Sequence, residues 1–176
     1  MGYNENDMGD LSDNFSHKDF ACHCPECRGE YRIHLGLVGI LEGIGAHFRR
    51  RPKILSGFYC GAYTEKLNRD KKTYHSSGKA VNISLENVPT AELFNYVQTI
   101  EGINGLGFYP EEKMVHIDTR PIEKKDAWIK ERGKYAPLTD DKRAQYGLNK
   151  LQAPDLPAGR QDHKPQKAEE PQPPTS

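Results

Sequence analysis

Two short apolar runs separated by a tight polar turn set the strongest limit on how this chain can fold. Gly107-Phe108-Tyr109 and Met114–Asp118 flank a turn at Pro110–Lys113. In the second run apolar and polar side chains alternate, which is typical of a strand with one buried face. The pattern predicts an antiparallel hairpin, and a hairpin of this kind needs further strands or helices to pack against.

Other segments supply such partners. Apolar residues recur at helical spacing from about Leu35 to Arg50 and again after Thr90, the expected N-cap of a helix that ends near Gly102 and Gly105. We therefore predict an α+β domain with a small antiparallel sheet and packed helices. Its remaining expected elements are strands at Lys53–Ser56 and Lys79–Ser84, a short helix within Tyr59–Asp70, and a weaker helical segment from Trp128.

Composition limits this domain to the middle of the chain. The 176 residues suffice for one domain. From Leu151 to Ser176 the chain is rich in Pro, Gln, Lys and Glu and has no aromatic residue, so we expect a disordered proline-rich tail. The expected divisions are a flexible N-terminus at 1–12, the folded domain at 13–135, a weak helical extension at 136–150, and the tail at 151–176.

The charge balance excludes one broad class of function. The chain has 25 Lys and Arg against 25 Asp and Glu, and this zero net charge argues against a nucleic-acid binder. We expect no membrane segment, because no apolar run approaches the ~20 residues that one needs. Polar and acidic residues follow Met1, so no signal peptide is predicted. A cytoplasmic protein is expected, unless it is exported by a route that the sequence does not show. Oligomeric state is not predicted.

Four cysteines form a second notable feature. Cys22, Cys24 and Cys27 lie close together in the sequence, whereas Cys60 is distant. Four thiolates can hold one structural zinc, and Cys-x-x-Cys is a common half-site. Two disulfides or buried thiols are the alternatives, and His23 could replace one thiolate as a ligand. A metal or a disulfide would tie the N-terminal segment to the strand before Cys60.

Histidines in two separate segments suggest a metal site. His75 precedes Gly78 and an expected strand that carries Asn82, and His116 lies on the second strand of the hairpin. On an alternating strand His116 and Asp118 point to the same face. Such a polar face is a reasonable wall for a site. Spacing alone leaves open that both histidines are surface residues or merely hydrogen-bonded ones.

Four motifs resemble a known family. They are Ile54–Phe58, Tyr74–Ile83, Gly105–Pro110 and Val115–Arg120. In this order and spacing they resemble the zinc D-Ala-D-Ala carboxypeptidases, the LAS-type metallopeptidases, and within them the YcbK-like murein endopeptidases and their phage relatives. The resemblance covers Phe15 to about Trp128. It implies a zinc site of His, Asp and His on a small sheet, with bound water that attacks peptides of the bacterial cell wall.

The sequence departs from that family pattern at the site. His75 and His116 fall on the two histidine ligands, but Asn82 stands where the family has Asp. An amide oxygen carries no charge, so zinc affinity should fall. Three residues after Ser56 the family usually has an Arg that binds substrate or holds the site, and this chain has Tyr59 there.

The resemblance leaves the catalytic proton acceptor open. Lys113 stands three residues before the second His, where many relatives have an acidic base. Glu111, Glu112 and Asp118 are the candidate substitutes, and Asp118 could instead support a ligand or complete the metal site. Ser56 and Tyr59 are candidate substrate-binding residues.

Two functions remain open at this point. The first is a zinc peptidase with a weakened site that acts on peptidoglycan peptides. The second is a pseudopeptidase whose groove binds a cell-wall peptide or a protein partner without cleaving it. Zinc is the expected cofactor at His75, Asn82 and His116, weakly bound or lost, with a second structural zinc considered at the cysteines.

Overall fold

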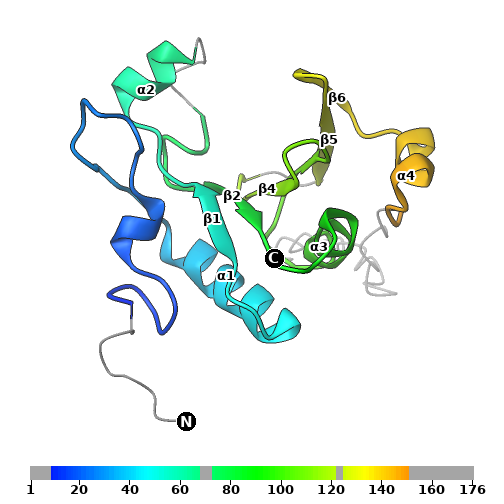
Figure 1. Ribbon diagram of the computed structural model, residues 1–176, viewed down its shortest axis with the longest axis horizontal. Helices are drawn as coiled ribbons and strands as arrows, with labels where there is room; N and C mark the ends of the chain where they lie inside the picture. The colour runs from blue at the N-terminus through cyan, green and yellow to red at the C-terminus, as the bar shows by residue number, and fades with distance from the viewer. Residues whose placement is uncertain (1–8, 68–72, 122–124, 151–176) are drawn as a thin grey trace, which may run out of the picture.

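The computed structural model describes residues 9–67, 73–121 and 125–150. It is an α+β domain, as predicted, built on one six-stranded sheet with the strand order β1-β2-β4-β3-β5-β6 (Figure 1). All neighbouring strands pair antiparallel except β3 and β5. The strands are β1 (Lys53–Ser56), β2 (Ala80–Ser84), β3 (Gly105–Tyr109), β4 (Met114–Asp118), β5 (Asp126–Glu131) and β6 (Lys134–Pro137). The tail predicted at 151–176 lies outside the described residues.

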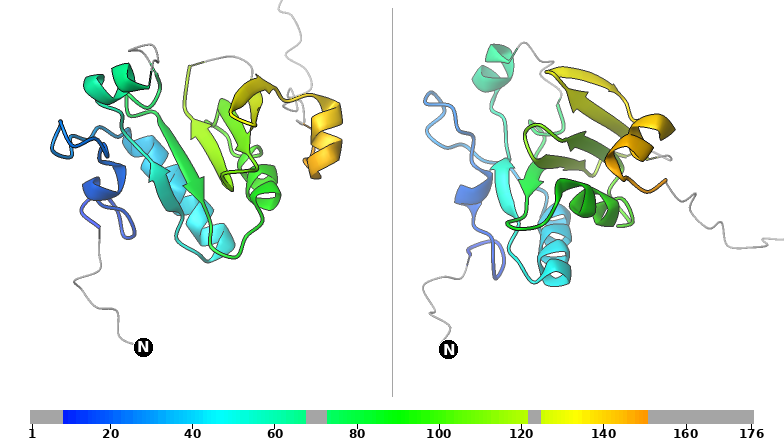
Figure 2. Two further views of the ribbon diagram at one scale, coloured as in Figure 1. Left: turned by 45° about the horizontal axis from the view of Figure 1, so that its top comes forward. Right: turned by 45° about the vertical axis from the view of Figure 1, so that its right-hand side comes forward.

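Two helices cover one face of the sheet (Figure 2). Leu37, Leu41 and Ile44 of α1 (Leu35–Phe48) are fully buried at the spacing that the sequence predicts. Leu93, Phe94 and Val97 of α3 (Thr90–Val97) join the same core cluster. The strands contribute their core-facing residues to it, among them Val81, Ile83, Leu106, Val115, Ile117 and Ile129. The opposite face of the sheet is therefore left for polar side chains.

Shorter helices lie at the edges of the sheet. A 3-10 helix, η2 (His17–Phe20), lies beside β1, and α2 (Gly61–Lys66) follows that strand. The last helix, α4 (Asp140–Tyr146), begins after the N-cap Thr139 and is followed by the C-cap Gly147. No helix in the described part of the chain is both long and apolar enough to span a bilayer.

Two predictions of local structure are wrong. The segment from Trp128 is not helical but belongs to β5, because it pairs in parallel with β3 from Gly105↔Asp126 to Phe108↔Ile129. A parallel partner is set by tertiary packing, which a local pattern does not report. The bounds of α3 also differ: its N-cap is Pro89 rather than Thr90, which is the first helical residue, and it ends at Val97 rather than near Gly102 and Gly105.

Candidate functional site

One row of residues runs across the whole sheet on the face opposite α1 and α3. Its centre is the register pair Asn82 on β2 and His116 on β4. Because alternate residues of a strand face opposite sides, register alone brings these two side chains together. Strand by strand, the row reads Ser56, Asn82, His116, Gly107, Trp128 and Pro137. Every member except Gly107 lines one pocket of about 870 Å³.

Two glycines of β3 make room for the side chains of the neighbouring strands β4 and β5. A Cβ at Gly107 would lie 2.8 Å from Trp128 Nε1 and 2.9 Å from His116 Cβ, so only a glycine lets these side chains approach. A Cβ at Gly105 would lie 2.1 Å from Asp118 Oδ2. The glycine at each position is therefore required by the close approach of functional side chains rather than by backbone conformation.

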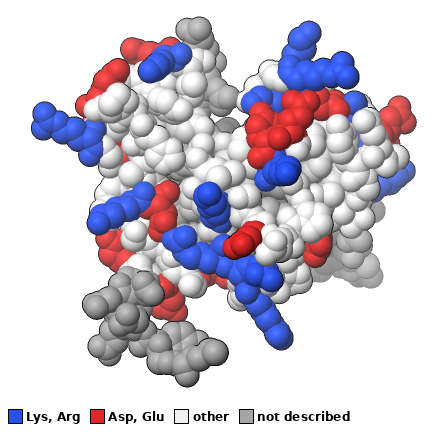
Figure 3. Space-filling view, viewed as in Figure 1, with Lys and Arg blue, Asp and Glu red and all other residues white. Residues whose placement is uncertain are grey.

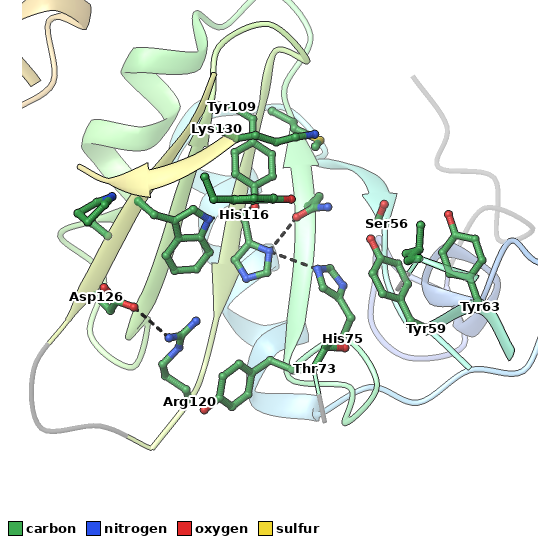
Figure 4. Close-up of a pocket in the computed structure, with 18 residues that line it drawn as sticks. Ser56, Tyr59, Tyr63, Thr73, His75, Tyr109, His116, Arg120, Asp126 and Lys130 are labelled. Atoms are coloured by element: carbon green, nitrogen blue, oxygen red, sulfur yellow. Dashed lines mark hydrogen bonds and ion pairs between the residues drawn. The ribbon is translucent and has the colours of Figure 1, made fainter. Parts of the chain in front are cut away.

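Three electron-pair donors converge in the pocket (Figure 4). His75 Nε2 lies 3.2 Å from His116 Nδ1, and Asn82 Oδ1 lies 2.9 Å from the same Nδ1. His75 comes from the loop before β2, whereas the other two come from paired strands. The structure thus brings together the three residues that the sequence motifs indicate as metal ligands.

In each histidine ring, the hydrogen bond made by one nitrogen fixes the other nitrogen as the atom that faces the pocket. His75 Nδ1 lies 2.7 Å from the carbonyl oxygen of Gly57, which can only accept, so Nδ1 carries the proton. His116 Nε2 lies 3.1 Å from Asp118 Oδ2 and donates to that carboxylate. Both rings therefore turn a lone pair toward the same point. A cation shared between them, either a proton or a metal ion, would satisfy both lone pairs.

This donor set fits a divalent metal ion. Two nitrogens bound to Zn²⁺ at ~2.0–2.1 Å in tetrahedral geometry lie ~3.4 Å apart, close to the 3.2 Å between His75 Nε2 and His116 Nδ1. Asn82 would add a neutral amide oxygen. The arrangement can hold the ion with two imidazoles and one uncharged oxygen, and this set lacks the carboxylate that the resemblance implies.

Asp118 lies behind His116 and supports it. The carboxylate is fully buried and accepts hydrogen bonds from Arg120 Nε at 2.8 Å and from Arg120 Nη2 at 2.6 Å. Burial raises the pKa of Asp118, but the hydrogen bonds from Arg120 and His116 outweigh it and bring the pKa to about 2. Hydrogen bonding to Asp118 in turn raises the pKa of Arg120. Asp118 is therefore an ionised acceptor that orients His116, and it does not line the pocket.

Aromatic side chains form the pocket walls. The ring of Tyr59 stacks on that of His75, with centroids 4.3 Å apart and planes at 13°. On the other side Trp128 Nε1 donates to the hydroxyl of Tyr109 at 3.1 Å. Figure 3 shows the hollow between α2 and the β5–β6 hairpin as mostly uncharged, with Lys, Arg, Asp and Glu gathered on its rims. Such a hollow suits an extended peptide with apolar and polar parts.

Of the other predicted site residues, some line the pocket and some lie outside it. Ser56 and Tyr59 both line the pocket. Glu112 lies on the turn between β3 and β4 and forms an ion pair with Lys130, which lines the pocket. Glu111 accepts a hydrogen bond from the backbone N–H of Arg132, away from the donors.

Several residues that line the pocket were not predicted from the sequence. Asp126 is the one carboxylate among the described residues that line the pocket, and Arg120 Nη1 donates to it at 3.2 Å. Arg120 also lies over the rings of Tyr74 and Trp128. The register of β5 places Asp126 and Trp128 at the pocket, and the sequence pattern did not predict a strand there.

The four cysteines cluster outside this pocket. Their Sγ atoms all lie within 4.8 Å of one another, and the residues are free thiols. Hydrogen bonding by the backbone N–H of Cys27 lowers the pKa of Cys24 to about 7, whereas burial raises the pKa of Cys60 to about 12. The cluster is thus compatible with a metal site. His23, considered as a replacement ligand, is exposed and lies outside it.

Comparison with known proteins confirms the family resemblance. Residues 49–125 match the sequence profile of a family described as peptidoglycan L,D-endopeptidase MepK. A probable peptidoglycan L,D-endopeptidase MepK of Haemophilus influenzae is 31% identical over 52 residues, which are 30% of this chain. The aligned part spans only 27% of that relative's length. Residues 49–125 contain all three donors together with Ser56 and Gly107 of the row, whereas Trp128 and Pro137 follow the matched region.

Proposed function

We propose that this chain, which shares its site-bearing segment with the peptidoglycan L,D-endopeptidases, binds a cell-wall stem peptide in the pocket and hydrolyses it with the help of zinc. The observation that carries the proposal is the convergence of His75 Nε2, His116 Nδ1 and Asn82 Oδ1 on one point of a peptide-sized pocket. A zinc ion held there would polarise the scissile carbonyl and lower the pKa of bound water toward ~7.

The chain's own residues supply binding and orientation. Asp118 keeps the Nδ1 lone pair of His116 directed into the pocket, and the Gly57 carbonyl does the same for His75 Nε2. Tyr59 and Trp128 offer flat apolar surfaces on either side of the donors. A stem peptide lying between them would place one carbonyl over the donor atoms.

Proton transfer would fall to a carboxylate at the pocket rim. Asp126 lines the pocket beside Arg120, and Glu112 pairs with Lys130 on the same side. Asp118 suits this role less well, because it is fully buried and bonded to Arg120 and His116. Loss of hydrolysis with retained peptide binding in Asp126→Asn or in Glu112→Gln would identify the proton acceptor.

Asn82 weakens the site without dismantling it. Its amide oxygen occupies the position of a ligand but contributes no charge, so the metal should bind less tightly than at a His, Asp, His site. For Asn82→Asp we expect zinc affinity to rise by at least ~100-fold, since even residues that only support ligands contribute 10–100-fold. Competition with a chromophoric chelator measures this change.

Hydrolysis of purified muropeptides, followed by chromatography, tests the activity. The unmodified chain with added zinc should release peptide fragments, and His116→Ala should not. If only Asn82→Asp is active, the natural chain is not a peptidase. Saturable binding of stem peptides by the inactive natural chain would then support the pseudopeptidase alternative, which Asn82 and Tyr59 motivate.

A further inference from the structure

The cysteine cluster joins two segments that are distant in the sequence. Cys22, Cys24 and Cys27 lie on a loop that folds back on itself, since Cys22 N–H donates to Glu30 O at 2.8 Å and Glu30 N–H donates to Cys27 O at 3.2 Å. Cys60 is the N-cap of α2. Three of the four side chains are buried and Cys27 is half-buried.

The sulfur positions suit tetrahedral coordination of one ion. Four thiolates bound to Zn²⁺ at ~2.3 Å lie ~3.8 Å from one another. The Sγ atoms of Cys24 and Cys60 are 3.3 Å apart, and no pair in the cluster exceeds 4.8 Å. The backbone N–H of Tyr63 lies 3.4 Å from Cys60 Sγ, and it donates there. Such a donor stabilises a negatively charged sulfur.

From this geometry we infer that Cys22, Cys24, Cys27 and Cys60 bind one structural Zn²⁺ that fastens the wall of the peptide pocket to the N-terminal segment. All four coordination positions are filled by protein sulfur, so the ion has no open position for a substrate and differs in kind from the one proposed at His75 and His116.

The cluster stands directly behind that wall. Phe58 packs against Cys22, Cys24 and Cys60, and its backbone N–H donates to Phe20 O at 2.8 Å. Next to it, a Cβ at Gly57 would lie 2.6 Å from Phe20 Cα, so the two segments are in close contact.

The wall in turn holds His75. The carbonyl oxygen of Gly57 accepts from His75 Nδ1 at 2.7 Å, and the ring of Tyr59 stacks on the same imidazole. Tyr59 immediately precedes Cys60. An ion at the cysteines would therefore restrict residues 57–60, and through them the orientation of His75.

Metal analysis of the full-length chain tests the inference separately from the proposed function. In His75→Ala/His116→Ala, which removes the pocket donors, we expect about one zinc per chain to remain after dialysis against a mild chelator. The same background with Cys24→Ser and Cys60→Ser should retain none. His23→Ala is the matched control because His23 lies within the cysteine motif but outside the cluster, and it should keep its zinc.

Cobalt substitution of the unmutated chain keeps the test valid if a cysteine variant does not fold. A thiolate-to-cobalt charge-transfer band in the near ultraviolet is expected. Four thiols that titrate freely while zinc is present, or a disulfide found by mass spectrometry without reduction, would overturn the inference. The proposed role predicts that a strong chelator accelerates amide hydrogen exchange at 57–60 more than at 114–118, and equal exchange would remove that role. Failure of muropeptide hydrolysis alone affects neither result.

Discussion

Replacing Gly105 by Ala tests whether Asp118 holds its place beneath the site. The new Cβ would lie 2.1 Å from Asp118 Oδ2 and 2.4 Å from its Cγ, far closer than atoms can approach. Gly105 does not have a positive φ, so alanine brings no backbone strain of its own. The whole effect must come from displacement of the Asp118 carboxylate.

The expected cost follows from what Asp118 binds. Its fully buried carboxylate accepts from Arg120 at 2.8 and 2.6 Å and from His116 at 3.1 Å. Breaking a buried pair costs ~3–5 kcal/mol. We expect about 3 kcal/mol, near the lower limit, because the carboxylate is displaced rather than removed. With a urea m-value of ~2 kcal/mol/M, the unfolding midpoint should fall by ~1.5 M.

Gly43→Ala is the matched control for this experiment. Gly43 is exposed on α1, and a Cβ there meets nothing within 4 Å. This alanine should stabilise the helix by ~0.5–1 kcal/mol.

In Gly105→Ala, zinc affinity at the pocket should fall ~10–100-fold, since His116 loses the group that orients it. An unchanged urea midpoint in Gly105→Ala would refute the packing of Asp118 against β3.

Two further predictions concern the N-terminal segment and the pocket wall. Burial raises the pKa of Glu42, but hydrogen bonds from Ser12 and Asn14 outweigh this effect and hold the pKa below its usual value. These bonds therefore stabilise the fold above pH ~4.3, and their contribution is lost as the pH falls through the folded-state pKa. Urea unfolding at pH 5, 4 and 3 should show a weaker acid dependence in Glu42→Gln, and an unchanged dependence would contradict this assignment. Tyr59→Leu removes the ring that stacks on His75 and should cost ~0.5–1.5 kcal/mol, whereas Tyr31→Leu, at a half-exposed ring, should change stability by less than ~0.5 kcal/mol.

The sequence was sufficient to predict the elements that carry their own periodicity. Met114–Asp118 alternates, and the structure places Val115 and Ile117 in the core with His116 on the pocket face, as expected. The helix predicted over Leu35–Arg50 is confirmed with an end at Phe48. In these segments local pattern and tertiary packing favour the same structure, so either one suffices to predict it.

Features that depend on pairing between strands were not predictable in this way. Trp128, Ile129 and Lys130 do alternate between pocket and core, but three residues are too few to distinguish a strand from a helix. Similarly, the spacing of Cys22, Cys24 and Cys27 predicts a half-site, whereas only the close contact of Phe20 with Gly57 brings Cys60 to it. Long-range register supplies the missing information in both cases.

The residues around Asn82 bear on whether this site still functions. Asp118, which is fully buried, forms a charged pair with the half-buried Arg120, and such a pair costs desolvation and is weak evidence for stability on its own. Gly105 and Gly107 leave strand β3 without side chains at two positions, which also weakens a strand. These four residues are explained if their role is to orient His116 so that its Nδ1 lone pair faces a cation in the pocket. The exchange of a carboxylate for an amide at Asn82 alters the charge at that point but leaves this support intact, and we infer that the site retains its capacity to bind metal.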